Sequence, residues 1–321
     1  MIAGFGLLFG SFLNVCIYRV PAGLSIVTPG SHCFSCGTPI RWFDNVPLVS
    51  YIILKGRCRW CGASFSPRYF FIELLTGILF GLTFYHFRYT LATPVYIVFI
   101  CLLIVATFTD IDHWIIPDGV SLGGALFGLA AALLAGFFPK GFVLADVFPL
   151  YGQGIYAPFV NAICGAAFGA FLVYLIGVIG TFIFRKEAMG FGDVKLFLLI
   201  GAFLGMVNCV FVLMLGSIIG SVIGGGLLLI DKLTAEKPPA SKNEKEEAGE
   251  ESAPPSPPEN KEERVLAMIL GQGASEDINE QSPPSPPSVH HLPFGPYLAV
   301  AAVIVLFAGE LLQRLLFGVM V

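Results

Sequence analysis

The sequence has little charge for its length. Of its 321 residues only 12% are charged, whereas 56% are hydrophobic, and the mean hydropathy is +0.81. Soluble domains carry about 25% charged residues, and a single soluble core this apolar would expose more hydrophobic surface than water tolerates. The composition therefore excludes an ordinary soluble enzyme, a nucleic-acid-binding protein and, for most of the length, a disordered chain. A lipid bilayer is the solvent that suits the bulk of this chain.

Several common sequence signals are also missing. The chain has no Gly-x-x-x-x-Gly-Lys-Ser/Thr phosphate loop, no glycine-rich nucleotide fingerprint and no evident nucleophile elbow or Ser-His pairing. The first apolar run lacks a preceding basic region and a small-residue cleavage site, and Arg19 follows it. A retained span is therefore expected there in preference to a signal peptide.

Long apolar runs predict an all-α polytopic membrane protein. A span needs about 20 residues, and runs of that order occupy 1–18, 70–87, 94–109, 119–138, 157–184 and 294–317. The stretch from Val194 to Ile230 is too long for one helix, and the segment from Gly205 to Asn208 offers a place to turn. Two helices are expected there, which gives about eight transmembrane helices in total.

The distribution of charge predicts the orientation. Residues 19–69 contain six Lys and Arg residues against one acidic residue, Asp44. Because loops rich in Lys and Arg stay in the cytoplasm, this loop is expected there. Counting spans then places 110–118, 185–193 and 231–293 on the same side. The protein is expected to be a multi-pass membrane protein with the lipid bilayer as a partner and no nucleic acid.

A polar stretch interrupts the second half of the chain. Thirteen of the 22 acidic residues lie between Asp231 and Glu280, and eleven prolines lie in 235–293. Such a composition cannot bury enough apolar surface to offset its chain entropy. The expected organisation is a first transmembrane helix (1–18), a cytoplasmic four-cysteine loop (19–69), a transmembrane core (70–230), a disordered acidic and proline-rich insert (231–293) and a last transmembrane helix (294–321).

Four of the eight cysteines form a spaced set in the 19–69 loop. Each Cys-x-x-Cys element places two thiolates on a tight turn, and two such turns make a tetrahedral cage for Zn²⁺. The cytoplasm is reducing, which disfavours disulfides, and a redox pair is the alternative. The spacing predicts a structural zinc knuckle whose ligands are Cys33, Cys36, Cys58 and Cys61.

Two short motifs place carboxylates where apolar runs meet polar loops. Asp110 and Asp112 lie in Phe-Thr-Asp-Ile-Asp-His-Trp-Ile-Ile-Pro-Asp, and Asp193 follows Gly-Phe-Gly. An ionisable residue at this depth is a candidate functional group. For Asp118, which ends the first motif, an ordinary helix start after a proline is the simpler interpretation. For Asp193 a helix N-cap is the alternative, but the span count puts Asp110 and Asp193 on the same side of the bilayer.

Two carboxylates at one depth can act as an aspartyl dyad. They tend to share one proton, so that the ionised group takes a proton from water while the neutral group donates to a scissile carbonyl. A transport or binding protein with an Asp ion site and a zinc docking loop is the competing class. Transport predicts further ionisable residues along a path, and the spans offer almost none besides Glu73 and Glu310.

Together these segments resemble the type IV prepilin peptidase family of membrane aspartyl proteases. The resemblance rests on GLLFGSFLNVCIYRVP (from Gly6), the double Cys-x-x-Cys loop with IRWFDNVPLVSY and RYFFIELLTG, FTDIDHWIIPD, MGFGDVKLFLLIGAFLG and PFGPYLAVAA. These motifs span nearly the whole chain outside 231–293.

The resemblance implies an activity and its residues. It assigns the catalytic pair to Asp110 and Asp193, with Asp112 as a weaker candidate. The implied reaction removes the basic leader of prepilins and pseudopilins after a glycine at the cytoplasmic face. Family members with the cysteine loop also methylate the new N-terminus with S-adenosylmethionine. No residues that bind this methyl donor are evident from the sequence.

Overall fold

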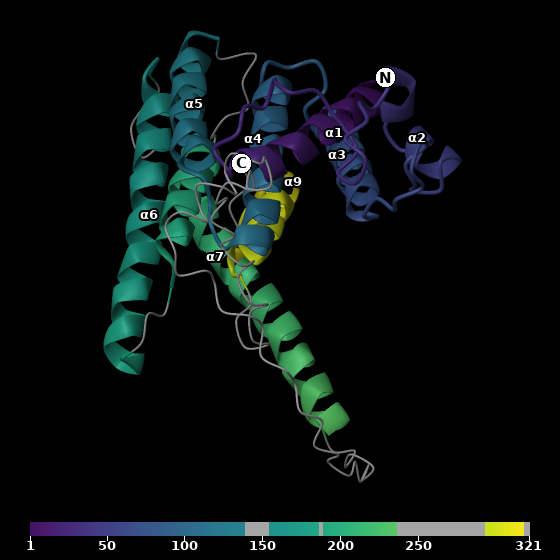
Figure 1. Ribbon diagram of the computed structural model, residues 1–321. Helices are drawn as coiled ribbons and strands as arrows, with labels where there is room; N and C mark the ends of the chain where they lie inside the picture. The colour runs from purple at the N-terminus through teal and green to yellow at the C-terminus, as the bar shows by residue number, and fades with distance from the viewer. Residues whose placement is uncertain (139–153, 186–188, 236–292, 318–321) are drawn as a thin grey trace, which may run out of the picture. The chain divides into compact units, whose positions relative to one another are not determined.

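The computed structural model describes residues 1–138, 154–185, 189–235 and 293–317, and Figure 1 shows that helices dominate them. Within these ranges strand-like pairing is limited to two isolated bridges, His32 with Pro39 and Arg57 with Ser64. The all-α prediction is confirmed. The elements are α1 (Ile2–Arg19), η1 (Trp42–Asn45), α2 (Val49–Ile53), α3 (Arg68–Phe87), α4 (Ala92–His113), α5 (Asp118–Phe137), α6 (Ala157–Phe184), α7 (Phe191–Ala235) and α9 (Gly295–Phe317).

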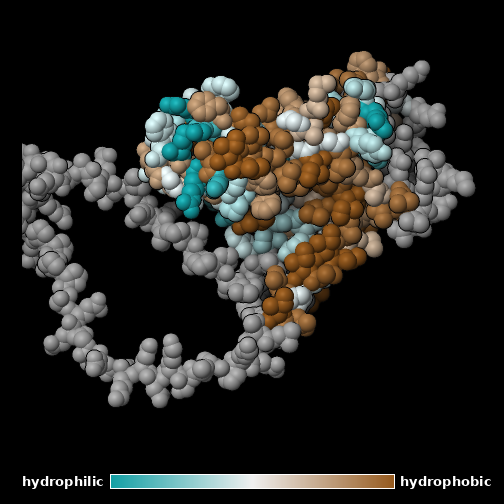
Figure 2. Space-filling model, turned by 90° about the vertical axis from the view of Figure 1, so that its right-hand side faces the viewer, coloured by the Kyte–Doolittle hydropathy of each residue, from teal (hydrophilic) through white to brown (hydrophobic). Residues whose placement is uncertain are grey.

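Six of the described helices are long and apolar enough to cross a membrane. They are α1, α3, α4, α5, most of α6 and the Phe191–Ile230 part of α7, and α9 adds a shorter apolar stretch, Gly295–Gly309. Figure 2 shows hydrophobic residues covering much of one face of the molecule, as lipid contact requires. The chain is therefore a membrane protein. The count of eight spans stays a prediction.

Gly205 interrupts α7 where the sequence predicts a turn. Its backbone angles are φ 77° and ψ 176°, which lie outside the helical region. Only glycine adopts such angles without strain. The long apolar stretch therefore consists of two helical parts that meet at Gly205.

The chain divides into two units by its internal contacts. The first unit comprises Met1–Gly224 with Pro293–Val321, and the second comprises Gly225–Leu292. Most of the predicted insert at 231–293 lies outside the described residues. The candidate sites all belong to the first unit.

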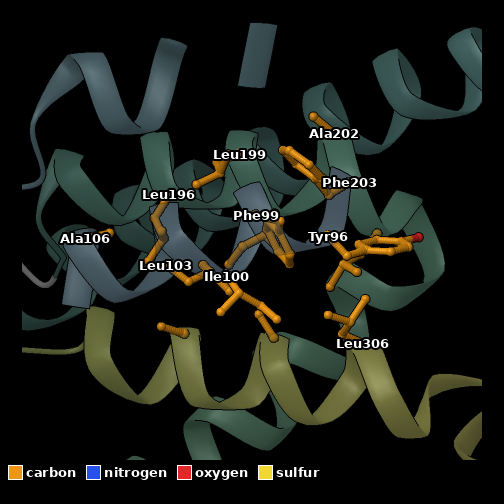
Figure 3. Close-up of a cluster of buried hydrophobic side chains, with 14 of the residues drawn as sticks. Tyr96, Phe99, Ile100, Leu103, Ala106, Leu196, Leu199, Ala202, Phe203 and Leu306 are labelled. Atoms are coloured by element: carbon orange, nitrogen blue, oxygen red, sulfur yellow. The ribbon is translucent and has the colours of Figure 1, made fainter. Parts of the chain in front are cut away.

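The core of the first unit lies where α4 packs against α7 and α9. Phe99 of α4 stacks on Phe203 of α7 with ring centroids 4.5 Å apart. Figure 3 shows Leu103 of α4 near Leu196 of α7, and Leu306 of α9 on the other side of the cluster. This packing fixes the ends of α4, α7 and α9 relative to one another.

Glycines allow two helix pairs to approach closely. Gly165 of α6 and Gly201 of α7 face each other, and a Cβ on either residue would collide with the carbonyl oxygen of the other. On α1, a Cβ at Gly10 would lie 2.7 Å from Cα of Glu73 on α3. Small residues at crossings are the usual way in which membrane helices gain contact area.

Candidate active site and metal centre

Asp110 lies in the last turn of α4. The helix ends at His113, and Trp114 follows in the left-handed conformation with its N–H donating to the Asp110 carbonyl oxygen over 3.0 Å. This termination places Asp110 at the end of an apolar helix, where only 8% of the residue is exposed. The carboxyl group is thus largely shielded from solvent within the protein.

Asp193 lies in the first turn of α7 and is also 8% exposed. Its backbone N–H donates to the carbonyl oxygen of Gly190 over 3.2 Å. The neighbouring Gly192 packs against Ile116, because a Cβ at Gly192 would lie 3.5 Å from Cδ1 of that side chain. The two motifs, far apart in the sequence, therefore meet in space. Asp110 and Asp193 lie close enough for their carboxylate charges to interact.

Gly295, the first residue of α9, covers the Asp110 side chain. Its backbone N–H donates a hydrogen bond to the Asp110 carboxylate. A Cβ at Gly295 would collide with Oδ2 of Asp110, so a larger residue cannot occupy this place without moving the carboxylate. This glycine lies in the PFGPYLAVAA motif, from which the sequence alone indicates no role for it. Only the fold brings it to the candidate pair.

Two ion pairs flank the candidate pair. Arg68 at the start of α3 binds Asp112, with 2.5 Å between Nη1 and Oδ1, and also reaches the Phe108 carbonyl oxygen. Lys195 of α7 binds Asp118, the first residue of α5. Asp112, the weaker catalytic candidate, is thus paired and partly exposed, unlike Asp110. Asp118 does begin a helix, as its simpler interpretation expects, and it also ties α5 to α7.

The four cysteines of the loop form one cluster. Their sulfur atoms all lie within 4.8 Å of one another, and those of Cys33 and Cys61 are 3.7 Å apart. In a tetrahedral site with Zn–S bonds of about 2.3 Å, neighbouring sulfurs are about 3.8 Å apart. The cluster therefore has the size that a four-thiolate zinc site requires.

The two Cys-x-x-Cys turns have the same backbone pattern. Gly37 donates to the Cys33 carbonyl oxygen and Gly62 to that of Cys58, over 2.9 and 3.0 Å. Both glycines have positive φ, 66° and 73°, which glycine adopts without strain because it has no side chain. Hydrogen bonds with the side chain and backbone of Thr38 lower the pKa of Cys36 to about 6. A lowered pKa favours the thiolate form of Cys36, whereas the pKa of Cys61 in the same cluster is raised to about 11.

An ion pair connects the second Cys-x-x-Cys turn to another part of the loop. Arg59, between Cys58 and Cys61, donates through Nε to both carboxylate oxygens of Asp44, over 3.0 and 2.9 Å. These hydrogen bonds lower the pKa of Asp44. Asp44 belongs to η1, so the pair connects this turn to the middle of the loop.

Two family models match the chain in its two halves. The bacterial peptidase A24 N-terminal domain matches residues 5–87, and the type IV leader peptidase family matches residues 97–225. A prepilin leader peptidase/N-methyltransferase of Myxococcus xanthus is 35% identical over 97% of this chain and 90% of its own length. The chain belongs to the type IV leader peptidase family.

Other members of the leader peptidase family agree with this membership. Proteins with the same name from Klebsiella pneumoniae and Neisseria gonorrhoeae are 34% and 33% identical, over 62% and 68% of this chain and 82% and 78% of their own lengths. No solved structure matches the chain significantly. The resemblance seen in the sequence motifs is confirmed.

The family domains divide the candidate sites. The N-terminal domain contains α1, the cysteine loop and α3, whereas the leader peptidase domain contains Asp110 and Asp193. Gly295 lies beyond both matched ranges. The start of α9 therefore contributes a residue to the candidate active site that lies outside both matched ranges.

Proposed function

We propose that this protein is a membrane aspartyl endopeptidase that removes the leader of type IV prepilins and pseudopilins, with Asp110 and Asp193 as its catalytic pair. The observation that carries this proposal is the meeting of the two carboxyl groups. They come from the end of α4 and the start of α7, both are 8% exposed, and their charges interact. Family membership and the names of the relatives support the same activity.

The pair performs hydrolysis by general acid–base catalysis. One aspartate is ionised and takes a proton from a water molecule, and this water attacks the scissile carbonyl carbon. The other aspartate is protonated and donates to the carbonyl oxygen, since two adjacent buried carboxyl groups favour sharing one proton. The peptide is cut without a covalent enzyme intermediate. The hydrogen bond from Gly295 holds the Asp110 carboxylate in place during this exchange.

The position of the pair, at the ends of two apolar helices, supports the proposed substrate and location. A prepilin has a transmembrane helix preceded by a basic leader, and cleavage after a glycine at the cytoplasmic face requires an active site at that boundary. The basic loop at 19–69 favours a cytoplasmic position for the motifs on the same side. We infer a multi-pass protein of the bacterial inner membrane whose active site and cysteine loop lie on the cytoplasmic side.

The second activity is methylation of the new N-terminus. The relatives are named prepilin leader peptidase/N-methyltransferases, and residues 5–87 of this chain match the N-terminal domain and include the four-cysteine loop. S-adenosylmethionine would supply the methyl group. Cys33, Cys36, Cys58 and Cys61 would hold one structural Zn²⁺, which would cross-link a loop that has few helices of its own.

Mass spectrometry of a prepilin incubated with the purified protein tests the proposed function. We expect a mass loss equal to the leader, and a further gain of one methyl group when S-adenosylmethionine is present. An unchanged prepilin mass with folded protein would contradict the peptidase assignment and favour a transport or binding role. Cleavage without methylation would restrict the function to the peptidase.

A further inference from the structure

Two buried amide side chains connect α9 to the second part of α7. Asn208 is 7% exposed and Gln313 is 8% exposed. Nε2 of Gln313 donates to Oδ1 of Asn208 over 3.0 Å, and Nδ2 of Asn208 donates to the Leu204 carbonyl oxygen over 2.9 Å. Both residues lie outside the motifs that carry the family resemblance. The hydrogen bond between them therefore needs an explanation of its own.

Gly309 allows the two helices to approach closely at this hydrogen bond. It lies four positions before Gln313, on the same face of α9. A Cβ at Gly309 would lie 3.3 Å from Oδ1 of Asn208, the oxygen that accepts the hydrogen bond. α9 thus presents both a space and a donor to the same asparagine.

A second contact joins the same two helices near the start of α9. A Cβ at Gly220 would lie 3.3 Å from Cδ2 of Tyr297. The contacts run in opposite directions along the two helices, since Asn208 meets Gln313 and the later Gly220 meets the earlier Tyr297. α9 and the second part of α7 are therefore antiparallel. Gly295, which donates to Asp110, lies at the Gly220 end of this pair.

The amide hydrogen bond is the more selective of the two contacts. Apolar side chains against a glycine tolerate a small slip between helices, whereas a hydrogen bond depends on direction and distance. A slip of α9 by one residue is a shift of about 1.5 Å with a rotation of about 100°. It would break this bond and leave two buried amides without their partner, which is unfavourable. A single buried polar residue can fix the register of packed helices in this way.

The register of α9 decides where Gly295 lies. Gln313 and Gly295 belong to one helix and are 18 positions apart, or about 27 Å along its axis. Any axial slip at Gln313 is therefore transmitted to Gly295. There the space is narrow, because even a Cβ would collide with the Asp110 carboxylate.

We propose that Asn208 and Gln313 are positioning residues for cleavage, because their hydrogen bond fixes the register of α9 and so places the Gly295 N–H on Asp110. The proposal rests on the proposed function, since it concerns a carboxyl group assigned to catalysis. The two amides act through α9 and lie far from the reacting atoms. A bond that only stabilises the folded protein is the competing explanation.

A single and a double variant separate positioning from stability. Gln313→Met removes the donor and leaves Oδ1 of Asn208 unpaired. We expect a lower unfolding temperature and a kcat for prepilin cleavage reduced about threefold to tenfold, with little change in KM. Asn208→Leu combined with Gln313→Met removes both polar groups, which is nearly neutral for stability, so the unfolding temperature should recover while kcat stays low. Recovery of kcat together with the unfolding temperature, or a wild-type kcat for Gln313→Met, would overturn the proposal.

A double-mutant cycle tests whether Gln313 acts through Gly295. In a Gly295→Ala background the N–H is already displaced, so adding Gln313→Met should lower kcat by less than about twofold. The same threefold to tenfold loss in both backgrounds would show that Gln313 acts by another route. Leu311→Met is the matched control, because Leu311 lies near Gln313 on α9 but is 60% exposed. It should leave kcat unchanged.

Hydrogen exchange measures the start of α9 without any substrate. Amides at 294–299 should exchange several-fold faster in Gln313→Met than in the wild-type protein or Leu311→Met. Unchanged exchange there would contradict the transmission of register along α9. Prepilin cleavage by the wild-type preparation shows separately whether the peptidase assignment stands.

Discussion

At the scale of single residues, the absence of a side chain at Gly295 is as important as the carboxylates beside it. The glycine leaves room for the Asp110 carboxyl group and donates its N–H to it. The position of a catalytic group within a fraction of an ångström affects the rate strongly. Gly295 is therefore a positioning residue for the proposed cleavage.

We expect Gly295→Ala to lower kcat for prepilin cleavage by roughly tenfold to a hundredfold, because its Cβ would displace the Asp110 carboxylate. KM should change little, since the substrate contacts are not altered. Steady-state kinetics measure both constants. Gly123→Ala on α5 is the matched control, as nothing lies within 4 Å of a Cβ there. A wild-type kcat for Gly295→Ala would show that the contact has no role in positioning.

At the scale of elements, the cysteine loop depends on a cross-link rather than on a large core. It contains only a short 3₁₀ helix and the five-residue helix α2, while Trp42, Ile53 and Trp60 are exposed. The two Cys-x-x-Cys turns bring four sulfur atoms together, and the Asp44–Arg59 ion pair holds the second turn against η1. A bound metal would stabilise this arrangement by fixing both turns to one point.

Purified protein should contain about one zinc ion per chain, because four thiolates complete one tetrahedral site. Cys36→Ser or Cys61→Ser should reduce the zinc content and lower the unfolding temperature. Elemental analysis by mass spectrometry measures the metal. Cys164→Ser on α6 is the control outside the loop. Protein without metal whose four loop cysteines are paired as disulfides would contradict both the zinc site and its cytoplasmic location.

The crossing of α6 and α7 depends on two glycines in direct contact. A Cβ at Gly201 would collide with the carbonyl oxygen of Gly165, and backbone atoms cannot move aside as a side chain can. We expect Gly201→Ala to destabilise the protein by about 1–3 kcal/mol, as overpacking in a tight core does. Thermal unfolding in detergent measures the change, again with Gly123→Ala as the control. An unchanged unfolding temperature would mean that the helices separate at little cost.

At the scale of the whole molecule, the sequence predicts the helical membrane class, the sulfur cluster and the break at Gly205. These depend on local properties: apolar run length, the spacing of cysteines, and a residue that tolerates unusual backbone angles. The sequence does not predict the ion pairs Arg68–Asp112 and Lys195–Asp118, because the partners are 44 and 77 positions apart. Nor does it predict that Gly295 covers Asp110, since these residues are 185 positions apart. Such contacts arise only when α3, α4, α5, α7 and α9 pack together.

The acidic, proline-rich segment is a separate feature at this scale. It belongs to the unit Gly225–Leu292, whereas both candidate sites lie in the other unit. We expect deletion of 238–290 to leave prepilin cleavage within about threefold of the full chain, because a spacer of this composition contributes little to a folded core. Cleavage assays in membranes measure this effect. Complete loss of activity in a protein that still inserts would show that the segment takes part in catalysis or substrate capture.

The central claim is that Asp110 and Asp193 perform the cleavage, and conservative variants at four acidic positions test it directly. Prepilin cleavage is measured for Asp110→Asn, Asp193→Asn, Asp112→Asn and Asp118→Asn, with thermal unfolding as the check on folding. The first two should lose activity by at least about a thousandfold, as removal of a general acid or base does. The last two should fall only a few-fold, since each removes a partly exposed ion pair. Normal cleavage by either Asp110→Asn or Asp193→Asn would contradict the catalytic pair.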